Sequence, residues 1–150
     1  MSTYELLADR QAIVDLTVLY CWSIDHHEFE RLREVFLPDA IAKLGDERSG
    51  IDSIIERIST ALTPLDGSQH IVANHQIHVD GDKATCRCYF QAQHVHRGVD
   101  GGSNYIIAGQ YEDELVRTTA GWRISRRVLV PTWSDGNPAV VRGNRPASTL

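Results

Sequence analysis

Three residues of this sequence, Asp25, His70 and His94, could together transfer protons. A carboxylate that binds one nitrogen of an imidazole fixes the tautomer of the ring and leaves the other nitrogen free to act as a base. An unperturbed imidazole titrates at about pH 6.5, so it can take a proton from a carbon beside an electron-withdrawing group and later return it. This chemistry needs no nucleophile and no redox centre, only a pocket in which the residues meet.

A helix predicted for residue 2 to about residue 25 positions Asp25. Its start, Ser2-Thr-Tyr-Glu5, has the form of a capping box. Its apolar stripe, which must be buried, comprises Ala12, Ile13, Leu16, Tyr20 and Ile24. We therefore expect the Asp25 carboxylate to lie at the edge of the surface that this helix covers, partly shielded from water.

Alternating sequence patterns place both histidines on strands. Residues 69–79 and 84–96 are predicted to form a hairpin around the turn Asp80-Gly81-Asp82. One face of the second strand carries small, apolar and imidazole side chains, from Ala84, Cys86, Cys88, Phe90, Ala92 and His94. Because alternate residues of a strand share a face, His94 is expected to point into a dry cavity.

Two more helices are expected before the hairpin. A short helix over residues 29–36 ends at Leu37-Pro38-Asp39, because proline cannot continue it. A short strand is expected over residues 40–44. A second capping box, Ser49-Gly-Ile-Asp52, is predicted to start a third helix that ends before Pro64.

The order of the elements predicts an α+β fold. Residues 105–117 and 122–130 give two further long strands, so the four long strands form a meander after the helices. Helices that cover one face of a curved, mainly antiparallel sheet leave a concave, largely apolar pocket for a small molecule. We expect one domain over residues 1–134 and a tail or flap over residues 135–150, which are rich in turn-forming residues.

Composition argues against several classes of partner. The chain has 15 basic and 20 acidic residues, a net charge of -5, whereas nucleic-acid or membrane-surface binding needs clustered basic charge. The basic run Arg123, Arg126 and Arg127 is too short to change this. No stretch approaches the roughly 20 apolar residues of a membrane span, and the N-terminus does not have the form of a signal peptide. We expect a cytoplasmic protein.

The cysteines and histidines give little support for a metal or a cofactor. The three cysteines are expected as reduced, buried thiols, with a thiol nucleophile as the alternative. A metal site could use His94-Val-His96, His70, His75 and His78. However, His75 and His78 have opposite strand parity and no carboxylate completes a zinc or iron set, so no metal is expected. The sequence has no glycine-rich nucleotide motif and no phosphate loop, so no cofactor is expected.

Several short motifs, in their order, resemble a known family. They are the helix end Ile24-Asp25, the segment Phe29-Glu-Arg-Leu32, the strand start Ser68-Gln-His70, and the strand pair Gly109-Gln-Tyr111 and Gly121-Trp-Arg-Ile124. Over nearly all of the first 130 residues the chain resembles the SnoaL-like family of the nuclear transport factor 2-like superfamily. The pattern is similar to scytalone dehydratase, bile-acid dehydratase and hexachlorocyclohexane dehydrochlorinase.

This resemblance implies a cone-shaped α+β barrel of the nuclear transport factor 2-like, or cystatin-like, type. It implies that Asp25 hydrogen-bonds His70 and that His70 is the base. Only the scytalone enzyme has a histidine matching His94. Tyr20 matches a catalytic tyrosine of the bile-acid enzyme. Arg127 matches an active-site arginine of the dehydrochlorinase, although a slip of one residue would put Arg126 there.

The resulting expectation is a cofactor-independent dehydratase, lyase or isomerase. It would act on a small cyclic, polyketide-like or steroid-like compound, with His94 or Tyr20 as a second proton donor. The resemblance also favours a homo-oligomer, either a trimer or, as the alternative, a dimer.

A non-catalytic interpretation of the same residues remains open. The chain could be a small-ligand binding protein, or a structural protein like the β-subunit of aromatic ring-hydroxylating dioxygenases. Asp25 would then cross-link helices, His70 would bind a backbone carbonyl and Tyr20 would be a core aromatic. Arg127 would be an exposed strand residue that pairs with Glu112 or Glu114.

Overall fold

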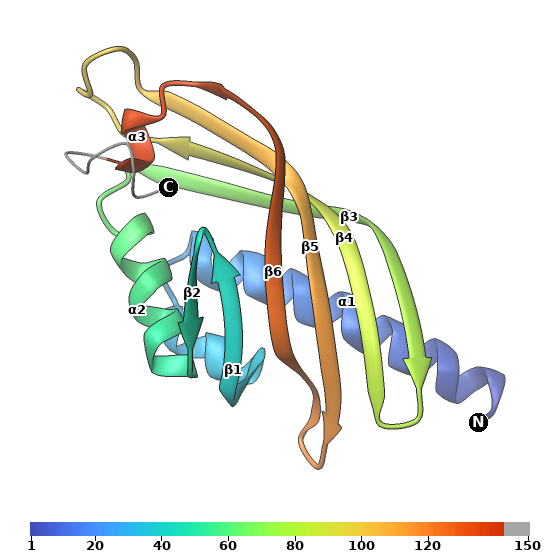
Figure 1. The fold of residues 1–150 in the computed structure, drawn as a ribbon. Helices are drawn as coiled ribbons and strands as arrows, with labels where there is room; N and C mark the ends of the chain where they lie inside the picture. The colour runs from blue at the N-terminus through green and yellow to red at the C-terminus, as the bar shows by residue number, and fades with distance from the viewer. Residues whose placement is uncertain (143–150) are drawn as a thin grey trace.

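A six-stranded sheet with helices against it makes up residues 1–142, which are the residues that this computed structural model describes (Figure 1). The elements in chain order are α1 (Thr3–Asp25), a 3-10 helix (Phe29–Glu34), β1 (Phe36–Leu44), β2 (Asp46–Ser49), α2 (Ile51–Leu62), β3 (Gly67–Asp80), β4 (Lys83–Val95), β5 (Asn104–Thr118), β6 (Gly121–Gly136) and α3 (Ala139–Arg142).

The strand order confirms the predicted α+β class and the meander. The sheet runs β2-β1-β6-β5-β4-β3, with β1 parallel to β6 and every other pair antiparallel. The sheet is strongly curved, as Figure 1 shows for β5 and β6, but its two edge strands β2 and β3 do not pair to close it. The fold is therefore an open, cone-like half-barrel.

A bulge helps to bend the sheet where it covers the pocket. The register between β5 and β6 shifts at Ala108 and Gly109, and such shifts increase local twist and bending. A Cβ atom at Gly109 would collide with the carbonyl oxygen of Val130. Only glycine allows the two backbones to approach so closely here.

Helix α1 brings Asp25 to the concave side of the sheet. The predicted capping box is confirmed, because the Ser2 hydroxyl accepts from the Glu5 N–H while the Glu5 carboxylate accepts from the Ser2 N–H. Four of the five predicted stripe residues are buried: Ile13, Leu16, Tyr20 and Ile24. Ala12 is exposed. The helix ends at Asp25 and leaves its side chain half-buried beside β3.

The region between α1 and α2 corrects two predictions. The second capping box is wrong, because α2 starts after Gly50, whose φ is 87°, and has no side-chain cap. Ser49 instead ends β2, where it pairs with Ile41 of β1. Strand β1 also starts earlier than expected, at Phe36. It includes Pro38 because the pairing with β6 is interrupted there, which removes the need for an N–H donor.

Strand β6 is longer than expected and continues into α3. The predicted end was residue 130, but pairing with β5 continues to Gly136. Helix α3 then packs against α2, β4 and β5. The division of the chain after residue 134 stays a prediction, and residues 143–150 of the predicted tail lie outside the described residues.

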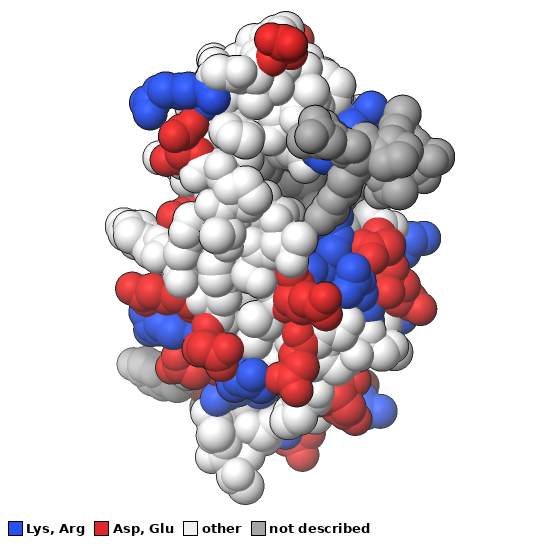
Figure 2. Space-filling view, turned by 90° about the vertical axis from the view of Figure 1, so that its left-hand side faces the viewer, with Lys and Arg blue, Asp and Glu red and all other residues white. Residues whose placement is uncertain are grey.

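The molecular surface shows no large field of one charge on the face in Figure 2, where acidic and basic side chains are interspersed. Within residues 1–142, no helix combines the length and the apolar character that crossing a bilayer requires. Cys21, Cys86 and Cys88 are free and buried, as predicted. Burial raises the pKa of the Cys21 thiol to about 12, so this thiol stays protonated.

Candidate active site

Asp25 and His70 form a short hydrogen-bonded pair between the end of α1 and the start of β3. The His70 Nδ1 lies 2.7 Å from the Asp25 Oδ1. The Asp25 carboxylate also accepts from the His70 backbone N–H at 2.8 Å and from the Ser68 hydroxyl at 2.9 Å. The alternative in which His70 binds a backbone carbonyl is wrong, although Asp25 does link the helix to the sheet.

Hydrogen bonds keep the Asp25 carboxylate ionised in spite of its burial. Burial alone would raise the pKa of Asp25, but hydrogen bonds from the His70 side chain, the His70 backbone and Ser68 outweigh it and lower this pKa. The carboxylate is therefore ionised and accepts the Nδ1–H of His70. When the ring of His70 is neutral, its Nε2 therefore carries the lone pair, which is the arrangement of an oriented general base.

His94 lies beside this pair, on the buried face of β4 as predicted. The rings of His70 and His94 meet edge to face, with centroids 5.7 Å apart. Burial, and then the neighbouring His70, lower the pKa of His94 to about 4, so its ring is neutral at pH 7. Its Nδ1 lies 3.2 Å from the Tyr105 carbonyl oxygen. Because a carbonyl only accepts, Nδ1 carries the hydrogen and Nε2 is a hydrogen-bond acceptor.

A pocket of about 860 Å³ contains the imidazoles of His70 and His94. Its walls come from α1, α2 and α3 and from every strand except β2. Most of the lining is apolar, for example Ile24, Ile58, Leu62, Ile107, Leu129 and Trp133. A cavity of this size and character can enclose a ligand of several fused or linked rings.

Tyr20 and Tyr111 are the aromatic residues that separate this pocket from the core. Both line the pocket, both are buried and their ring centroids are 5.7 Å apart. Burial raises the pKa of Tyr20 in spite of the nearby Arg127 cation. Its phenol is therefore neutral and able to donate a hydrogen bond. The sequence analysis did not identify Tyr111 as a pocket residue, although Tyr111 faces inward on β5.

Arg127 lies behind the tyrosines and does not line the pocket. Its guanidinium is fully buried, binds both oxygens of Asp113 at 2.8 Å, and lies 4.4 Å and 4.1 Å from the ring centroids of Tyr20 and Tyr111. The alternative of an exposed Arg127 paired with Glu112 or Glu114 is therefore wrong.

Arg126 points the other way. It lies 3.4 Å from Glu47 and lines a groove on the outer face of the sheet. Of the two neighbouring arginines, Arg127 is thus the one that faces inward, beneath the pocket.

The other histidines do not gather around the pocket. His75 binds the Thr17 hydroxyl of α1 and His78 is exposed. His96 follows the end of β4. Within residues 1–142 no three His, Cys, Asp or Glu side chains are arranged to hold a metal ion.

Comparisons with known proteins agree with this architecture. Residues 5–128 match the SnoaL-like domain family. The uncharacterized protein Rv2910c of Mycobacterium tuberculosis strain H37Rv is 36% identical over an alignment of 128 residues that covers 81% of this chain and 84% of that protein.

Two solved structures share the fold. A protein of Novosphingobium aromaticivorans assigned as a scytalone dehydratase has a TM-score of 0.82 at 24% identity, over 91% of this chain and 92% of its own. The type 3 hexachlorocyclohexane dehydrochlorinase of Novosphingobium barchaimii has a TM-score of 0.79 at 20% identity, over 93% and 97% of the two chains. From the match of residues 5–128, this chain belongs to the SnoaL-like domain family.

Proposed function

We propose that this protein is a cofactor-independent dehydratase or related lyase that acts on a small cyclic hydroxy-carbonyl compound. The observation that carries the proposal is the 2.7 Å contact of Asp25 with His70 where His70 lines a largely apolar pocket. A base with a fixed tautomer, in a largely apolar pocket, suits proton abstraction from carbon.

The elimination needs only the imidazole of His70 as a proton carrier. Its Nε2 takes the proton from the carbon next to the substrate carbonyl, and the C–H electron pair forms an enolate. The enolate then expels the β-hydroxyl group as the carbon–carbon double bond forms. The leaving oxygen takes the proton back from Nε2, so water and an enone are released and the enzyme is unchanged.

Other polar groups of the pocket assist the substrate. The neutral Tyr20 phenol can donate to the enolate oxygen, where negative charge develops. His94 was expected as an alternative donor, but the tautomer set by Tyr105 makes its free nitrogen an acceptor. We therefore assign His94 to binding the substrate hydroxyl. Arg127 acts from behind, by holding Tyr20 in place.

The structural neighbours support the reaction class by their names. One is assigned as a scytalone dehydratase and the other is a hexachlorocyclohexane dehydrochlorinase. Both names describe an elimination, of water in the first and of hydrogen chloride in the second. Isomerisation is the same chemistry with the proton returned to another carbon of the enolate.

The test is turnover of a panel of cyclic β-hydroxy ketones, followed by the absorbance of the enone product. His70→Ala and Asp25→Asn should each lower kcat by about 10²–10⁴-fold, the usual contribution of a general base. His78→Ala is the matched control, because His78 lies on the same strand but is exposed. Retained turnover in both pocket variants would contradict the proposal.

The non-catalytic alternative makes a different prediction in the same assay. A ligand carrier, or a protein like a dioxygenase β-subunit, would bind ring compounds without releasing water, and would show no exchange of the α-hydrogen in D₂O. Exchange that disappears in His70→Ala would support the catalytic role even if the panel lacks the true substrate.

The homo-oligomer also remains a prediction, with the trimer favoured over the dimer. The outer side chains of β4 available for such contacts are Thr85, Arg87, Tyr89 and Gln91, which are all exposed, and the half-buried Gln93. Light scattering of the purified protein would distinguish the two states.

A further inference from the structure

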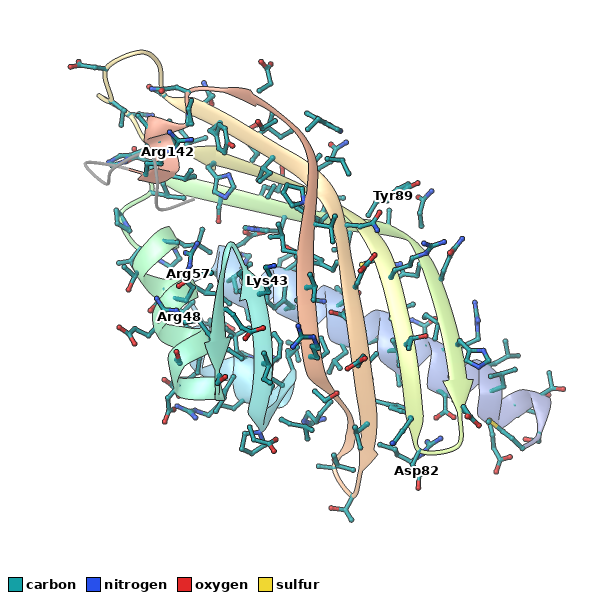
Figure 3. All side chains as sticks on the ribbon, in the orientation of Figure 1. Lys43, Arg48, Arg57, Asp82, Tyr89 and Arg142 are labelled. Carbon is teal, nitrogen blue, oxygen red and sulfur yellow. The ribbon has the colours of Figure 1, made fainter. Side chains whose placement is uncertain are left out.

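The charges on the pocket wall are all of one sign. Three cationic side chains line the pocket: Lys43 from β1, Arg57 from α2 and Arg142 from α3. No aspartate or glutamate of residues 1–142 lines it. Figure 3 shows the three cations on one side of the molecule, away from Tyr89 and Asp82. This is unexpected for a chain whose net charge is -5.

Two of these cations have no carboxylate partner in the part of the chain that the structure describes. Lys43 is exposed and forms no ion pair there with any acidic residue. Arg142 likewise forms none, and its buried Nε has no hydrogen-bond partner among residues 1–142. An unpaired donor in a buried position is costly unless a ligand satisfies it.

The third cation is only partly neutralised. Arg57 lies 2.7 Å from Asp46 and donates to the Leu44 carbonyl oxygen. The same Asp46 carboxylate binds Arg48, also at 2.7 Å. Asp46 is thus shared between two guanidinium groups, of which Arg48 also lies 3.9 Å from Glu56. Within residues 1–142 no carboxylate lines the pocket beside Arg57.

We propose that the substrate carries an anionic oxygen group, a carboxylate or a phosphate, which Lys43, Arg57 and Arg142 bind while the apolar ring system extends toward His70. This inference rests on the proposed function, because it takes the pocket to be the substrate site. Charge-assisted hydrogen bonds from arginine and lysine recognise both kinds of group. Most of the remaining lining is apolar, so the substrate class is an amphiphilic acid.

A matched pair of fluorescent ligands tests this selectivity without knowledge of the substrate. The sulfonate 8-anilino-1-naphthalenesulfonate and the neutral N-phenyl-1-naphthylamine share one ring system and differ in charge. Wild-type protein should bind the sulfonate about tenfold more tightly than the neutral compound, as a charge-assisted contact predicts. The difference should shrink at high salt, because Lys43 is exposed to solvent.

The variants Lys43→Met and Arg142→Met should reduce the preference for the sulfonate. The double variant should lose about tenfold in affinity for it and keep the affinity for the neutral ligand, which shows that the pocket is intact. Arg87→Met is the matched control, because Arg87 is exposed on β4 and does not line the pocket. Displacement by 1-naphthoate, 1-naphthyl phosphate and the neutral 1-naphthol then distinguishes carboxylate from phosphate.

Each outcome decides one of the two proposals. Equal binding of the charged and neutral ligands by wild type, an undiminished preference in the double variant, or an equal loss in Arg87→Met would overturn the anion site. None of these results would affect the role of His70. Conversely, turnover retained in His70→Ala would overturn the elimination chemistry and leave an anion-selective binding pocket.

Discussion

Two buried acid–base pairs of this molecule, Asp25 with His70 and Asp113 with Arg127, differ in what they face. The side chains of Asp25 and His70 are 13% and 8% exposed, and His70 lines the pocket. Those of Asp113 and Arg127 are 0% exposed, and neither lines it. Tyr20 and Tyr111 line the pocket and lie against the Arg127 guanidinium.

The comparison shows that the role of a buried carboxylate depends on which residue it pairs with and on whether that residue lines the pocket. Burial alone would lower the pKa of Arg127, but the effect of Asp113 and the two tyrosines is larger and raises it. The positive charge of Arg127 is therefore permanent. A permanent ion pair can position its neighbours and cannot accept a proton. The imidazole of His70 can change its charge, and it has a free nitrogen in the pocket.

The largest expected effect on stability comes from breaking the pair of Asp113 and Arg127, which does not line the pocket and is called the closed pair below. Asp113→Ala leaves Arg127 charged and unpaired in the core and should lower the free energy of unfolding by about 3–5 kcal/mol, as measured by urea denaturation. Asp82→Ala is the control, because that carboxylate is 81% exposed in its pair with Arg117 and should cost less than about 1 kcal/mol.

A double variant keeps this prediction decisive if the single variant does not fold. In Asp113→Leu combined with Arg127→Met, both charges are gone and apolar side chains replace them, so most of the stability should return. A double variant no more stable than Asp113→Ala would mean that the pair is not a self-contained structural unit.

The next effect concerns His94, which lies beside the pair of Asp25 and His70, called the open pair because His70 lines the pocket. The folded pKa of His94 is about 4 against an ordinary value of 6.5, so between these pH values the unfolded chain binds a proton that the folded chain does not. The free energy of unfolding therefore falls as the pH drops through this range, by about 3 kcal/mol at most for this residue.

His94→Gln should remove that part of the pH dependence. Burial also lowers the pKa of His75, so the stability of the variant will still depend partly on pH. The difference between variant and wild type isolates the contribution of His94. Thermal unfolding followed at several pH values from 7 to 4 measures the difference. Identical pH dependence in both proteins would show that His94 is not held neutral in the fold.

The open pair should contribute less to stability than the closed one. Asp25→Asn keeps the shape of the side chain but loses charge-assisted hydrogen bonds from His70 and Ser68, which should cost about 1–3 kcal/mol in urea unfolding. A loss as large as that in Asp113→Ala would mean that the open pair stabilises the fold as much as the closed pair does.

Much of the fold could be predicted because its periodic patterns agree with its contacts. The alternation that ends at His94 marks the buried face of β4, and the apolar stripe of α1 places Asp25. Strand β2 could not be found this way. Its sequence, Asp46–Ser49, is polar throughout, and it is a strand only because it pairs with β1.

Arg127 is an example of a strand residue whose side, inward or outward, the sequence pattern could not decide. A register shift between β5 and β6 at Glu114 and Leu115 changes which residues of the two strands face the same side. The sequence therefore could not decide between Arg126 and Arg127, nor identify Asp113 as the partner. The pocket cations Lys43, Arg57 and Arg142 gave no local signal at all, because they line one pocket from β1, α2 and α3, which are far apart in the sequence.

Ser68 is a further residue whose role only the structure reveals, and its removal should have the smallest effect. Its hydroxyl donates to the Asp25 Oδ1 at 2.9 Å, and Asp25 keeps both bonds from His70 without it. Ser68→Ala should therefore lower the free energy of unfolding by about 1 kcal/mol. Ser125→Ala, which removes an exposed bond to the Glu114 carbonyl oxygen, is the control.

The pH dependence of this loss identifies its cause. Asp25 has a lowered pKa in the folded state, so its stabilising contribution is present above its ordinary pKa of 3.8 and is lost as the pH falls through the folded value. Without the Ser68 hydroxyl the folded pKa of Asp25 is less depressed. Wild type and Ser68→Ala should therefore differ at pH 7 and converge in acid, whereas a constant difference would assign the loss to packing and not to the carboxylate.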